Sequence, residues 1–256
     1  MVISKKNIIA IIQARLTSSR LPGKVLAKIN DKTVIEHIFT RVSESHLIDK
    51  VVVATSTDSS DDPLADFCSQ KGMLVFRGPL SDVLKRFQLC AEEYKASHIL
   101  RITGDCPLID PIILDAVITA ALAGNYDCYG LGGDFPDGLD CTLLSADALR
   151  VADSNAKLPS EREHVCPYIE KNNTVFKLGV LELFSGMSDK RWTLDEGDDL
   201  KLISLIYKHL YQEEKIFYTP EILDWLEHNP AAGEINKHII RNEGYLKSLN
   251  QDIENT

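Results

Sequence analysis

Short apolar runs alternate with segments of helical periodicity through the first half of the chain. The runs are rich in β-branched residues and have the length of strands that are buried on both faces of a sheet. They predict strands over 8–12, 50–55, 73–76 and 98–103. Between the runs, apolar residues recur at helical spacing and predict helices over 34–45, 64–71, 82–94 and 111–123.

Two of these helices are preceded by a clear start signal. In both, an aspartate that can cap a helix is followed by a proline at the first helical position: Asp61 or Asp62 caps the helix with Pro63, and Asp110 precedes Pro111. Strand–helix alternation with short connections is produced by right-handed βαβ units, whose strands run parallel. We therefore expect an α/β fold with a mostly parallel sheet flanked by helices.

The pattern changes after Gly124. A segment rich in Gly and Asp is followed by a predicted strand over 139–144, helices over 145–155 and 161–170, and a strand over 175–183. We interpret residues 126–183 as an excursion from the sheet that forms a small lid or a dimerisation element. A brief strand over 192–194 then returns the chain to the core.

The remainder of the chain is helical in pattern. We expect helices over 198–211, 220–228 and 232–249. The chain has no internal repeat, and its 256 residues are enough to bury a full core. We interpret it as a single domain over 1–256, with the excursion and a helical C-terminal extension over 220–250.

Composition narrows the class of protein. A net charge of −10 argues against general nucleic-acid binding, which needs a basic face. No stretch approaches the roughly 20 apolar residues of a bilayer span, and the start of the chain lacks the apolar core of a signal peptide. The six cysteines show no metal-binding spacing and indicate free thiols in a reducing compartment. We therefore expect a cytoplasmic protein without a nucleic-acid partner or membrane insertion.

The first predicted strand ends in a cationic loop. Residues 14–24 include Arg15, Arg20 and Lys24, three hydroxyl side chains, a Pro and a Gly. In an α/β sheet, anionic ligands bind in the loop beyond the carboxyl end of a strand. The spacing matches neither the P-loop nor the dinucleotide-binding fingerprint. The loop therefore predicts a different kind of phosphate site, with a solvated basic loop as the alternative.

Two aspartates stand where metal-binding carboxylates are expected. Asp105 follows Gly104 just beyond the strand over 98–103, and Asp195 ends the brief strand over 192–194. Carboxylates at strand ends suit Mg²⁺, which combines one or two carboxylates with substrate phosphates. A turn or helix-cap role is the alternative for Asp105.

Together, the basic loop and the two carboxylates indicate a reaction on a triphosphate that uses a metal ion. Asp105 and Asp195 would hold Mg²⁺ against phosphate oxygens, while Arg15 and Lys24 neutralise a leaving pyrophosphate. An acceptor oxygen could then attack the α-phosphorus in line, with catalysis mostly by positioning and charge stabilisation. No cysteine has an evident activating partner, so we expect no covalent intermediate.

Several motifs resemble those of one family, in the same order and over essentially the whole chain. The strongest combines Gly104–Asp105 with a first loop that contains Gln13-Ala14-Arg15, Ser18, Arg20 and Leu21-Pro22-Gly23-Lys24. Weaker motifs lie at 53–58, 76–78, 101–107, 136–140, 162–165 and 241–249. The chain resembles the cytidylyltransferases that make CMP-activated sugars. These include the CMP-sialic acid and CMP-KDO synthetases and, most similar of all, the spore-coat polysaccharide SpsF group.

This resemblance implies a Rossmann-like, GT-A-type nucleotidyltransferase that needs Mg²⁺. It would condense CTP with a sugar acid or phosphorylated sugar-like acceptor for surface-glycan synthesis, with release of pyrophosphate. Arg15, Lys24 and Asp105 are then the expected catalytic residues, with Asp105 and Asp195 as metal ligands. The nucleotide-binding residues implied by the first loop are Gln13, Ala14, Arg15, Ser18, Arg20 and Lys24. Related synthetases dimerise, so we also expect a homodimer.

Further candidates come from the other matching motifs. Arg77 and Asp82 would contact the ribose or the base, with helix capping as the alternative for this segment. Arg101 and Thr103 share one face of a strand and would contact the nucleotide, with a structural salt bridge as the alternative.

On the acceptor side, the candidates are Asp137, Arg162 and His164, with structural hydrogen bonding as the alternative for the last two. Thr142 stands where the family often has Glu, so the acceptor stays open.

Two other functions are compatible with the sequence alone. A GT-A-like glycosyltransferase shares the sheet and the strand-end aspartates, although it has less need for Lys24 and two arginines beside the phosphates. A non-catalytic nucleotide-binding module would bind the same ligand without turnover.

Overall fold

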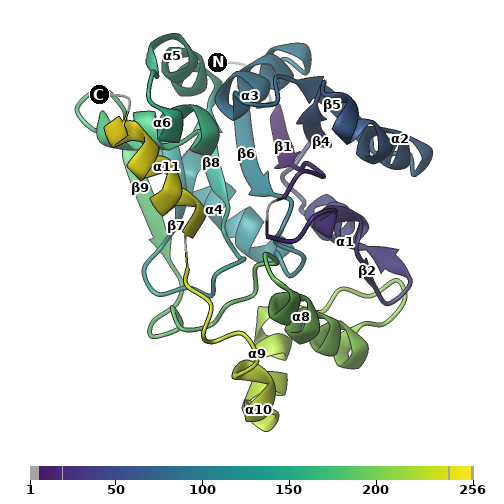
Figure 1. The fold of residues 1–256 in the computed structure, drawn as a ribbon. Helices are drawn as coiled ribbons and strands as arrows, with labels where there is room; N and C mark the ends of the chain where they lie inside the picture. The colour runs from purple at the N-terminus through teal and green to yellow at the C-terminus, as the bar shows by residue number, and fades with distance from the viewer. Residues whose placement is uncertain (1–5, 19, 242, 255–256) are drawn as a thin grey trace.

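The computed structural model contains a central seven-stranded mixed sheet, which helices cover on both faces (Figure 1). The structure describes residues 6–18, 20–241 and 243–254. Its strands lie in the order β5-β4-β1-β6-β8-β7-β9. Their bounds are β1 (Ile8–Gln13), β4 (Lys50–Ser56), β5 (Leu74–Gly78), β6 (His98–Thr103), β7 (Cys128–Gly132), β8 (Thr142–Ser145) and β9 (Leu178–Glu182). A separate two-stranded hairpin consists of β2 (Lys28–Ile29) and β3 (Lys32–Thr33).

The first half of the chain forms the parallel part of the sheet. Strand β1 pairs in parallel with both β4 and β6, and β4 pairs in parallel with β5. The four predicted strands are confirmed with shifts of one or two residues at their ends. The intervening helices are α1 (Val34–Ser43), α2 (Asp62–Gln70), α3 (Val83–Glu93) and α4 (Pro111–Gly124). The predicted α/β fold with a mostly parallel, helix-flanked sheet is therefore confirmed.

Side chains along β1 alternate between two hydrophobic cores, one on each face of the sheet. Ile8, Ala10 and Ile12 belong to the core that α1 and α4 share. Ile9 and Ile11 belong to the core that includes α3 and α5 (Ala146–Asn155). Burial on both faces explains why this strand has an almost unbroken apolar sequence. Because β1, β4, β5 and β6 run parallel, the segments that follow them meet at one edge of the sheet.

Residues 126–183 differ from the expected excursion, because they extend the sheet. Strand β8 pairs antiparallel with β6 and with β7, and β9 pairs parallel with β7. The β7 sequence, CYGLG, is too short and too rich in glycine to show a strand pattern. The region therefore completes the scaffold beside the first loop.

The predicted helix over 161–170 is divided into α6 (Pro159–His164) and α7 (Pro167–Lys171). Between them, Val165 has φ 71° and ψ −53°, and the Cys166 amide donates to the His164 carbonyl at 2.8 Å. These features define a γ-turn of the rare, strained form. It ends α6 at His164 and turns the chain sharply into α7.

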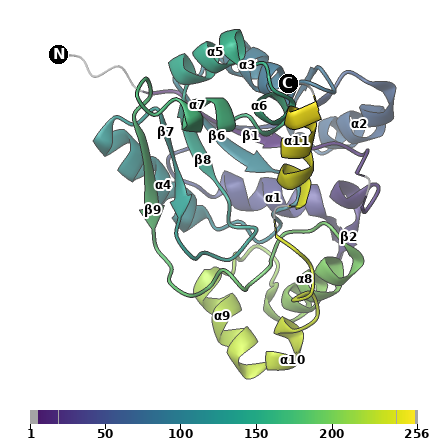
Figure 2. The same cartoon turned by 60° about the vertical axis from the view of Figure 1, so that its left-hand side comes forward.

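The C-terminal part contains α8 (Gly197–Leu210), α9 (Thr219–His228), α10 (Pro230–Gly233) and α11 (Glu243–Glu254). The predicted helix over 232–249 is interrupted, because the buried Asn236 side chain donates to the Arg191 carbonyl and to Asp199. Residues 192–194 form no strand; only the neighbouring Arg191 makes a single bridge, to Asp137. Figure 2 shows α8, α9 and α10 below the sheet, whereas α11 lies against α6. Among the described helices, none has the length and apolar composition that a membrane span requires.

Candidate active site

A cavity of about 1000 Å³ opens at the carboxyl ends of β1 and β6. Such a volume lies at the upper end of the range for small-molecule sites. Most of the candidate residues line this cavity. They are Gln13, Ala14, Arg15, Ser18, Arg20, Lys24, Arg101, Thr103, Asp105, Arg162, His164 and Asp195.

The first loop is shaped by backbone contacts and one buried carboxylate. Asp61 accepts hydrogen bonds from the Leu16 amide at 2.7 Å and from the Ser56 hydroxyl at 2.5 Å. Gly23 has φ 70° and donates its amide to the Leu16 carbonyl at 3.0 Å. The left-handed conformation at Gly23 starts the short helix Lys24–Leu26. Asp61, a candidate helix cap in the sequence, therefore fixes the loop.

Gly104 brings Asp105 against the end of β1. Its amide donates to the Gln13 carbonyl at 2.8 Å. A Cβ at this position would lie 2.8 Å from the same oxygen and 2.9 Å from the Ala14 Cβ. Only glycine allows so close an approach, so it sets the position of the carboxylate that follows.

Lys24 lies between the two predicted metal ligands. Its Nζ donates to Asp105 Oδ2 at 2.9 Å and to Asp195 Oδ1 at 2.8 Å. Burial lowers the pKa of Lys24, but the charges of both carboxylates outweigh this effect and raise it. Burial likewise raises the pKa of Asp105, and Lys24 reverses this effect and brings that pKa to about 2. At neutral pH the Asp105 carboxylate is therefore ionised, and the carboxylates of Asp105 and Asp195 both point at the Lys24 ammonium.

Asp195 is held from behind by a buried network that the sequence did not reveal. Its Oδ2 accepts from Arg191 at 3.1 Å, and Arg191 also forms a two-point pair with Asp199 at 2.9 and 3.1 Å. Asp199 is fully buried and accepts from the amides of Asp195 and Glu196, both at 2.9 Å. Asp199 therefore stabilises the start of the following helix, and the same carboxylate also positions Asp195.

The donor set fits a hard divalent cation. Asp105 and Asp195 present carboxylate oxygens from two separate chain segments within hydrogen-bond distance of one Lys24 nitrogen. Oxygen ligands of this kind suit Mg²⁺, which leaves its other positions for water and phosphate oxygens.

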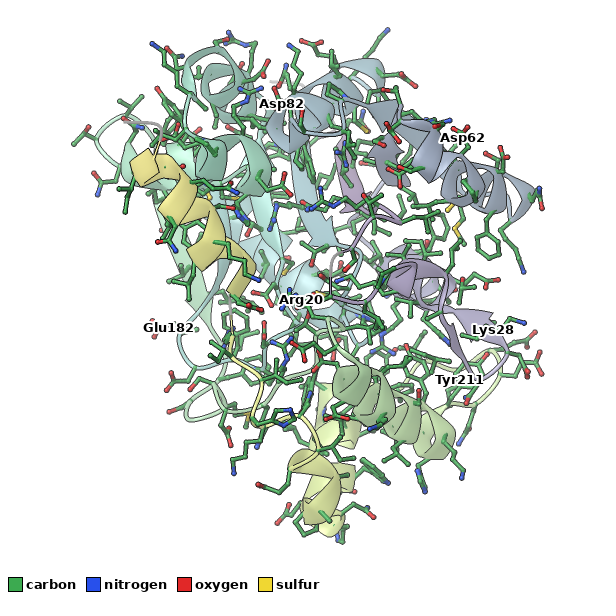
Figure 3. The ribbon with its side chains drawn as sticks, viewed as in Figure 1. Arg20, Lys28, Asp62, Asp82, Glu182 and Tyr211 are labelled. Atoms are coloured by element: carbon green, nitrogen blue, oxygen red, sulfur yellow. The ribbon has the colours of Figure 1, made fainter. Side chains whose placement is uncertain are left out.

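The other two cations of the loop face the cavity and pair with acids. Arg20 donates to Asp195 Oδ1 at 2.9 Å and to Glu243 of α11 at 3.3 Å. Arg15 pairs with Glu163 of α6 at 3.2 Å. Figure 3 shows Arg20 beside the carboxyl ends of the central strands. Three cations at one end of a cavity can neutralise a polyphosphate.

Arg77 and Asp82 do not line the cavity that the described residues form, and both have structural partners. Arg77 donates to the Ser56 and Asp58 carbonyls and to Asp62, so it ties down the loop after β4. Asp82 caps α3 and pairs with Arg162 at 2.5 Å. Figure 3 shows both Asp62 and Asp82 well away from Arg20.

Of the three acceptor-side candidates, Arg162 and His164 line the cavity and Asp137 does not. Asp137 does not line the cavity; it is buried against Arg191 at 3.1 Å, with a pKa raised to about 6 by burial and by the Asp140 charge. Arg162 lines the cavity, but its guanidinium is held by Asp82 and Asp153. His164 also lines it and forms a 2.9 Å hydrogen bond with Ser248 of α11.

Comparison with known proteins decides between the activities that this geometry allows. The family model described as cytidylyltransferase matches residues 9–221. The chain belongs to the cytidylyltransferase family.

Three similar proteins illustrate the relationship. The Bacillus subtilis spore coat polysaccharide biosynthesis protein SpsF is 32% identical over 233 residues, which cover 88% of this chain and 96% of SpsF. The Chlamydia pneumoniae 3-deoxy-manno-octulosonate cytidylyltransferase is 38% identical over 113 residues, 43% of each chain. A solved cytidylyltransferase from Leptospira borgpetersenii serovar Hardjo-bovis aligns with a TM-score of 0.85 and 30% identity over 92% of this chain and 100% of its own. The resemblance predicted from the sequence motifs is confirmed, and the chain is a nucleotidyltransferase.

Two polar atoms in the cavity of this cytidylyltransferase have no partner among the described residues. The Gln13 Oε1 and the Arg101 Nε are both buried without a hydrogen bond. Arg101 also forms no salt bridge within the described part of the chain, in contrast to Arg15 and Arg20. The alternative of a structural salt bridge for Arg101 is therefore not supported among the described residues.

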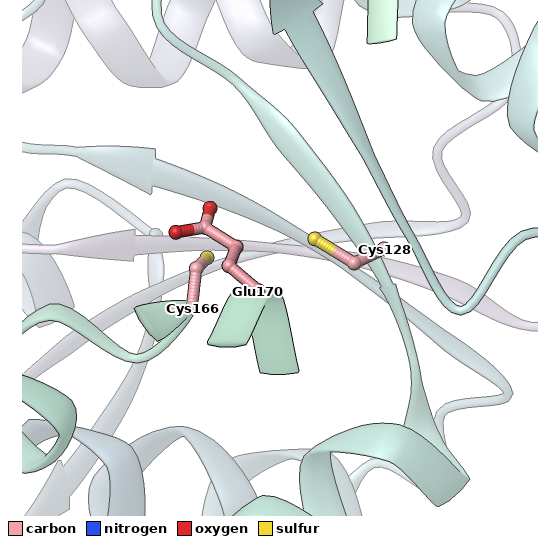
Figure 4. A group of neighbouring side chains, drawn as sticks. All are labelled: Cys128, Cys166 and Glu170. Carbon is pink, nitrogen blue, oxygen red and sulfur yellow. The ribbon is translucent and has the colours of Figure 1, made fainter. Parts of the chain in front are cut away.

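A second group of potential ligands lies outside the cavity of the cytidylyltransferase. Cys128, Cys166 and Glu170 bring their ligand atoms within 4.8 Å of one another (Figure 4). Thiol ligands suit soft or borderline metals rather than Mg²⁺, so this cluster does not compete with Asp105 and Asp195 for that ion. All six cysteines are buried and free, as their spacing predicted.

Proposed function

We propose that this cytidylyltransferase transfers CMP from CTP to a sugar acid or phosphorylated sugar-like acceptor and releases pyrophosphate. The product would serve surface polysaccharide synthesis. The observation that carries the proposal is the convergence of Lys24 and Arg20 with Asp105 and Asp195 at the strand ends. The names of two relatives support the substrate class, because one makes spore coat polysaccharide and another acts on 3-deoxy-manno-octulosonate.

The loop cations would act on the departing group. An acceptor oxygen forms a bond to the α-phosphorus of CTP, and the bond between this phosphorus and the bridging oxygen breaks. Lys24 and Arg20 contact the Asp105 and Asp195 carboxylates, and Arg15 lines the same cavity, so these three cations would neutralise the charge that grows on pyrophosphate. Fixed charges of this kind stabilise a transition state without any covalent role for the protein.

We propose Mg²⁺ as the cofactor, with Asp105 and Asp195 as its protein ligands. When bound, the ion would neutralise phosphate charge and polarise the phosphate oxygens. Arg191 and Asp199 would keep Asp195 aimed at this position, and Gly104 would do the same for Asp105.

A homodimer that uses β9 is also proposed. Strand β9 is an edge of the sheet and exposes Val180 (55%), while Val175 (69%) and Leu183 (47%) lie beside its two ends. Apolar side chains on an unpaired edge favour association with another chain. Light scattering during size-exclusion chromatography tests this proposal, since a mass of one chain would exclude it. The free cysteines favour a reducing compartment, so we propose the cytoplasm.

Pyrophosphate release tests the enzymatic proposal. Each nucleoside triphosphate is incubated with Mg²⁺ and a panel of sugar acids and sugar phosphates. Release with CTP and one acceptor is the expected result. Asp105→Asn should lower kcat by at least about 100-fold, whereas the exposed Asp147→Asn on α5 should keep wild-type activity. Failure of every triphosphate, together with transfer from a nucleotide-sugar, would favour the glycosyltransferase alternative.

A further inference from the structure

Helix α11 is attached to the edge of the cavity by specific contacts with α6. The Ser248 hydroxyl meets His164 Nε2 at 2.9 Å, and the Tyr245 ring lies edge-on to the same imidazole at 5.1 Å. Asp252 accepts from the Ser160 amide at 2.9 Å and from its hydroxyl at 2.6 Å. Figures 1 and 2 both show the two helices side by side. The helix is therefore a fixed part of the cavity wall.

One face of α11 is turned to the cavity. Gly244, Lys247, Ser248 and Gln251 line it, and their spacing of three, four and seven positions defines one side of a helix. This stripe carries the Lys247 ammonium, which pairs with Glu243 at 2.7 Å, and the Gln251 amide. It also carries the Ser248 hydroxyl, which is bonded to His164 and to the Gly244 carbonyl. Leu246, on another side, is 51% exposed. The cavity face of α11 therefore has the hydrogen-bonding groups that a polyhydroxylated, acidic molecule requires.

The position of the stripe separates it from the phosphate end of the cavity. Lys24, Asp105 and Asp195 mark that end, and α11 contacts it through Glu243, which accepts from Arg20 at 3.3 Å. From there the helix extends along α6 to Ser160. It also lies outside residues 9–221, which match the family model and contain the predicted nucleotide contacts. Contacts that this segment adds are thus suited to the substrate that differs between family members.

We propose that the polar stripe of α11 is the acceptor-recognition wall of the enzyme, with Lys247 and Gln251 binding polar groups of the acceptor. This inference rests on the proposed function, because it assigns one half of the same cavity to the second substrate. Lys247 supplies a positive charge for a carboxylate or phosphate, and Gln251 supplies an amide for hydroxyl groups. Arg20 connects this wall to the first loop through Glu243.

The test compares acceptor and nucleotide affinities in full-length variants. The acceptor is the sugar acid or sugar phosphate that supports pyrophosphate release by the wild-type enzyme. The double variant Lys247→Gln/Gln251→Ala should raise the acceptor KM about tenfold, the loss expected for two hydrogen bonds. Its Kd for CTP, measured by calorimetry, should stay within about twofold of wild type. Leu246→Ala is the matched control on α11 and should change neither constant.

Each result supports or overturns the inference. A rise in acceptor KM with unchanged CTP affinity and unchanged Tm supports it, as does recovery of a normal KM in Lys247→Arg. An unchanged acceptor KM, or an equal loss of CTP affinity, overturns it while the proposed function stands. If the wild-type enzyme releases pyrophosphate with no acceptor at all, the proposed function fails and this assignment fails with it.

Discussion

The guanidinium of Arg191 forms a buried two-point ion pair with Asp199 directly behind Asp195. The same Asp199 carboxylate accepts two backbone amides at the start of α8. Asp199 thus stabilises the start of α8 and, through Arg191, also positions the proposed metal ligand Asp195. The pair is more than a surface contact, because both partners are buried.

Asp199→Asn should therefore destabilise the protein and reduce turnover together. Removing one member of a buried pair leaves the other charge uncompensated, which costs about 3–5 kcal/mol. Urea denaturation should show this loss. Asp198→Asn is the control, since Asp198 pairs only with the exposed Lys201 and with His238 at the surface. Equal denaturation midpoints for the two variants would contradict a structural role for Asp199.

Lys24→Ala should weaken CTP binding by about 10- to 100-fold, the range for a lost charge-assisted hydrogen bond. The substitution also leaves Asp105 and Asp195 facing each other without the ammonium that they share. Titration calorimetry with CTP measures the change. Lys28→Ala, at an exposed position of the hairpin, should bind CTP like the wild type. An unchanged isotherm for Lys24→Ala would remove this residue from the phosphate site.

Gly104→Ala should displace Asp105 and lower both stability and kcat. The added Cβ would lie closer to the Gln13 oxygen and the Ala14 Cβ than real contacts allow, and such overpacking costs about 1–3 kcal/mol. Gly197→Ala is a suitable control, because nothing lies within 4 Å of its added Cβ. Thermal unfolding and pyrophosphate release measured on both variants test the argument. Normal kcat in Gly104→Ala would show that Asp105 tolerates the shift.

Because of His164, the free energy of unfolding should decrease as the pH is lowered below neutrality. Burial, followed by the charges of Arg101, lowers its pKa to about 4, whereas an unfolded histidine titrates near 6.5. The unfolded chain then binds more protons between these values, so this contribution is complete above about pH 6.5 and is lost toward about pH 4.

The variant His164→Gln lacks this titration. The difference in unfolding free energy between wild type and His164→Gln should therefore shrink as the pH falls from 7 to about 4. His209→Gln, on the exposed surface of α8, should follow the wild-type profile. A difference that stays constant with pH would exclude the lowered pKa.

Arg77→Ala should leave CTP affinity unchanged. Arg77 contacts Ser56, Asp58 and Asp62 rather than the cavity, so its loss affects the loop after β4. A small decrease in Tm with a normal calorimetric titration is the expected result. A CTP affinity reduced tenfold would restore this residue to the nucleotide site.

The convergence of Lys24 with Asp105 was predictable because it depends on local sequence and parallel topology. Lys24 and Asp105 follow apolar strands, and parallel strands bring their carboxyl ends to one edge. Arg77 and Asp82 also follow a strand, but no local pattern shows that their side chains turn to Asp62 and Arg162. The end of a strand predicts where the next residue lies along the sheet edge, but it does not predict the direction in which that residue's side chain points.

Features that rest on distant contacts were missed. Strand β7 has too few apolar residues to be seen without its neighbours, and the break before α11 depends on Asn236 reaching Asp199. The role of Arg191 likewise depends on Asp137, from a distant segment, which meets the same guanidinium as the nearby Asp195 and Asp199. Tertiary contacts override the local pattern at each of these positions.

The shared position of Arg20 has a kinetic consequence. Its guanidinium is divided between Asp195 and Glu243 at the first turn of α11. A triphosphate that enters the first loop competes for the same donors and weakens the tie to Glu243. We therefore expect the nucleotide to bind before the acceptor. Initial-rate kinetics should accordingly show a compulsory sequence, and Arg20→Lys, which cannot bridge two acids in the same way, should make addition random.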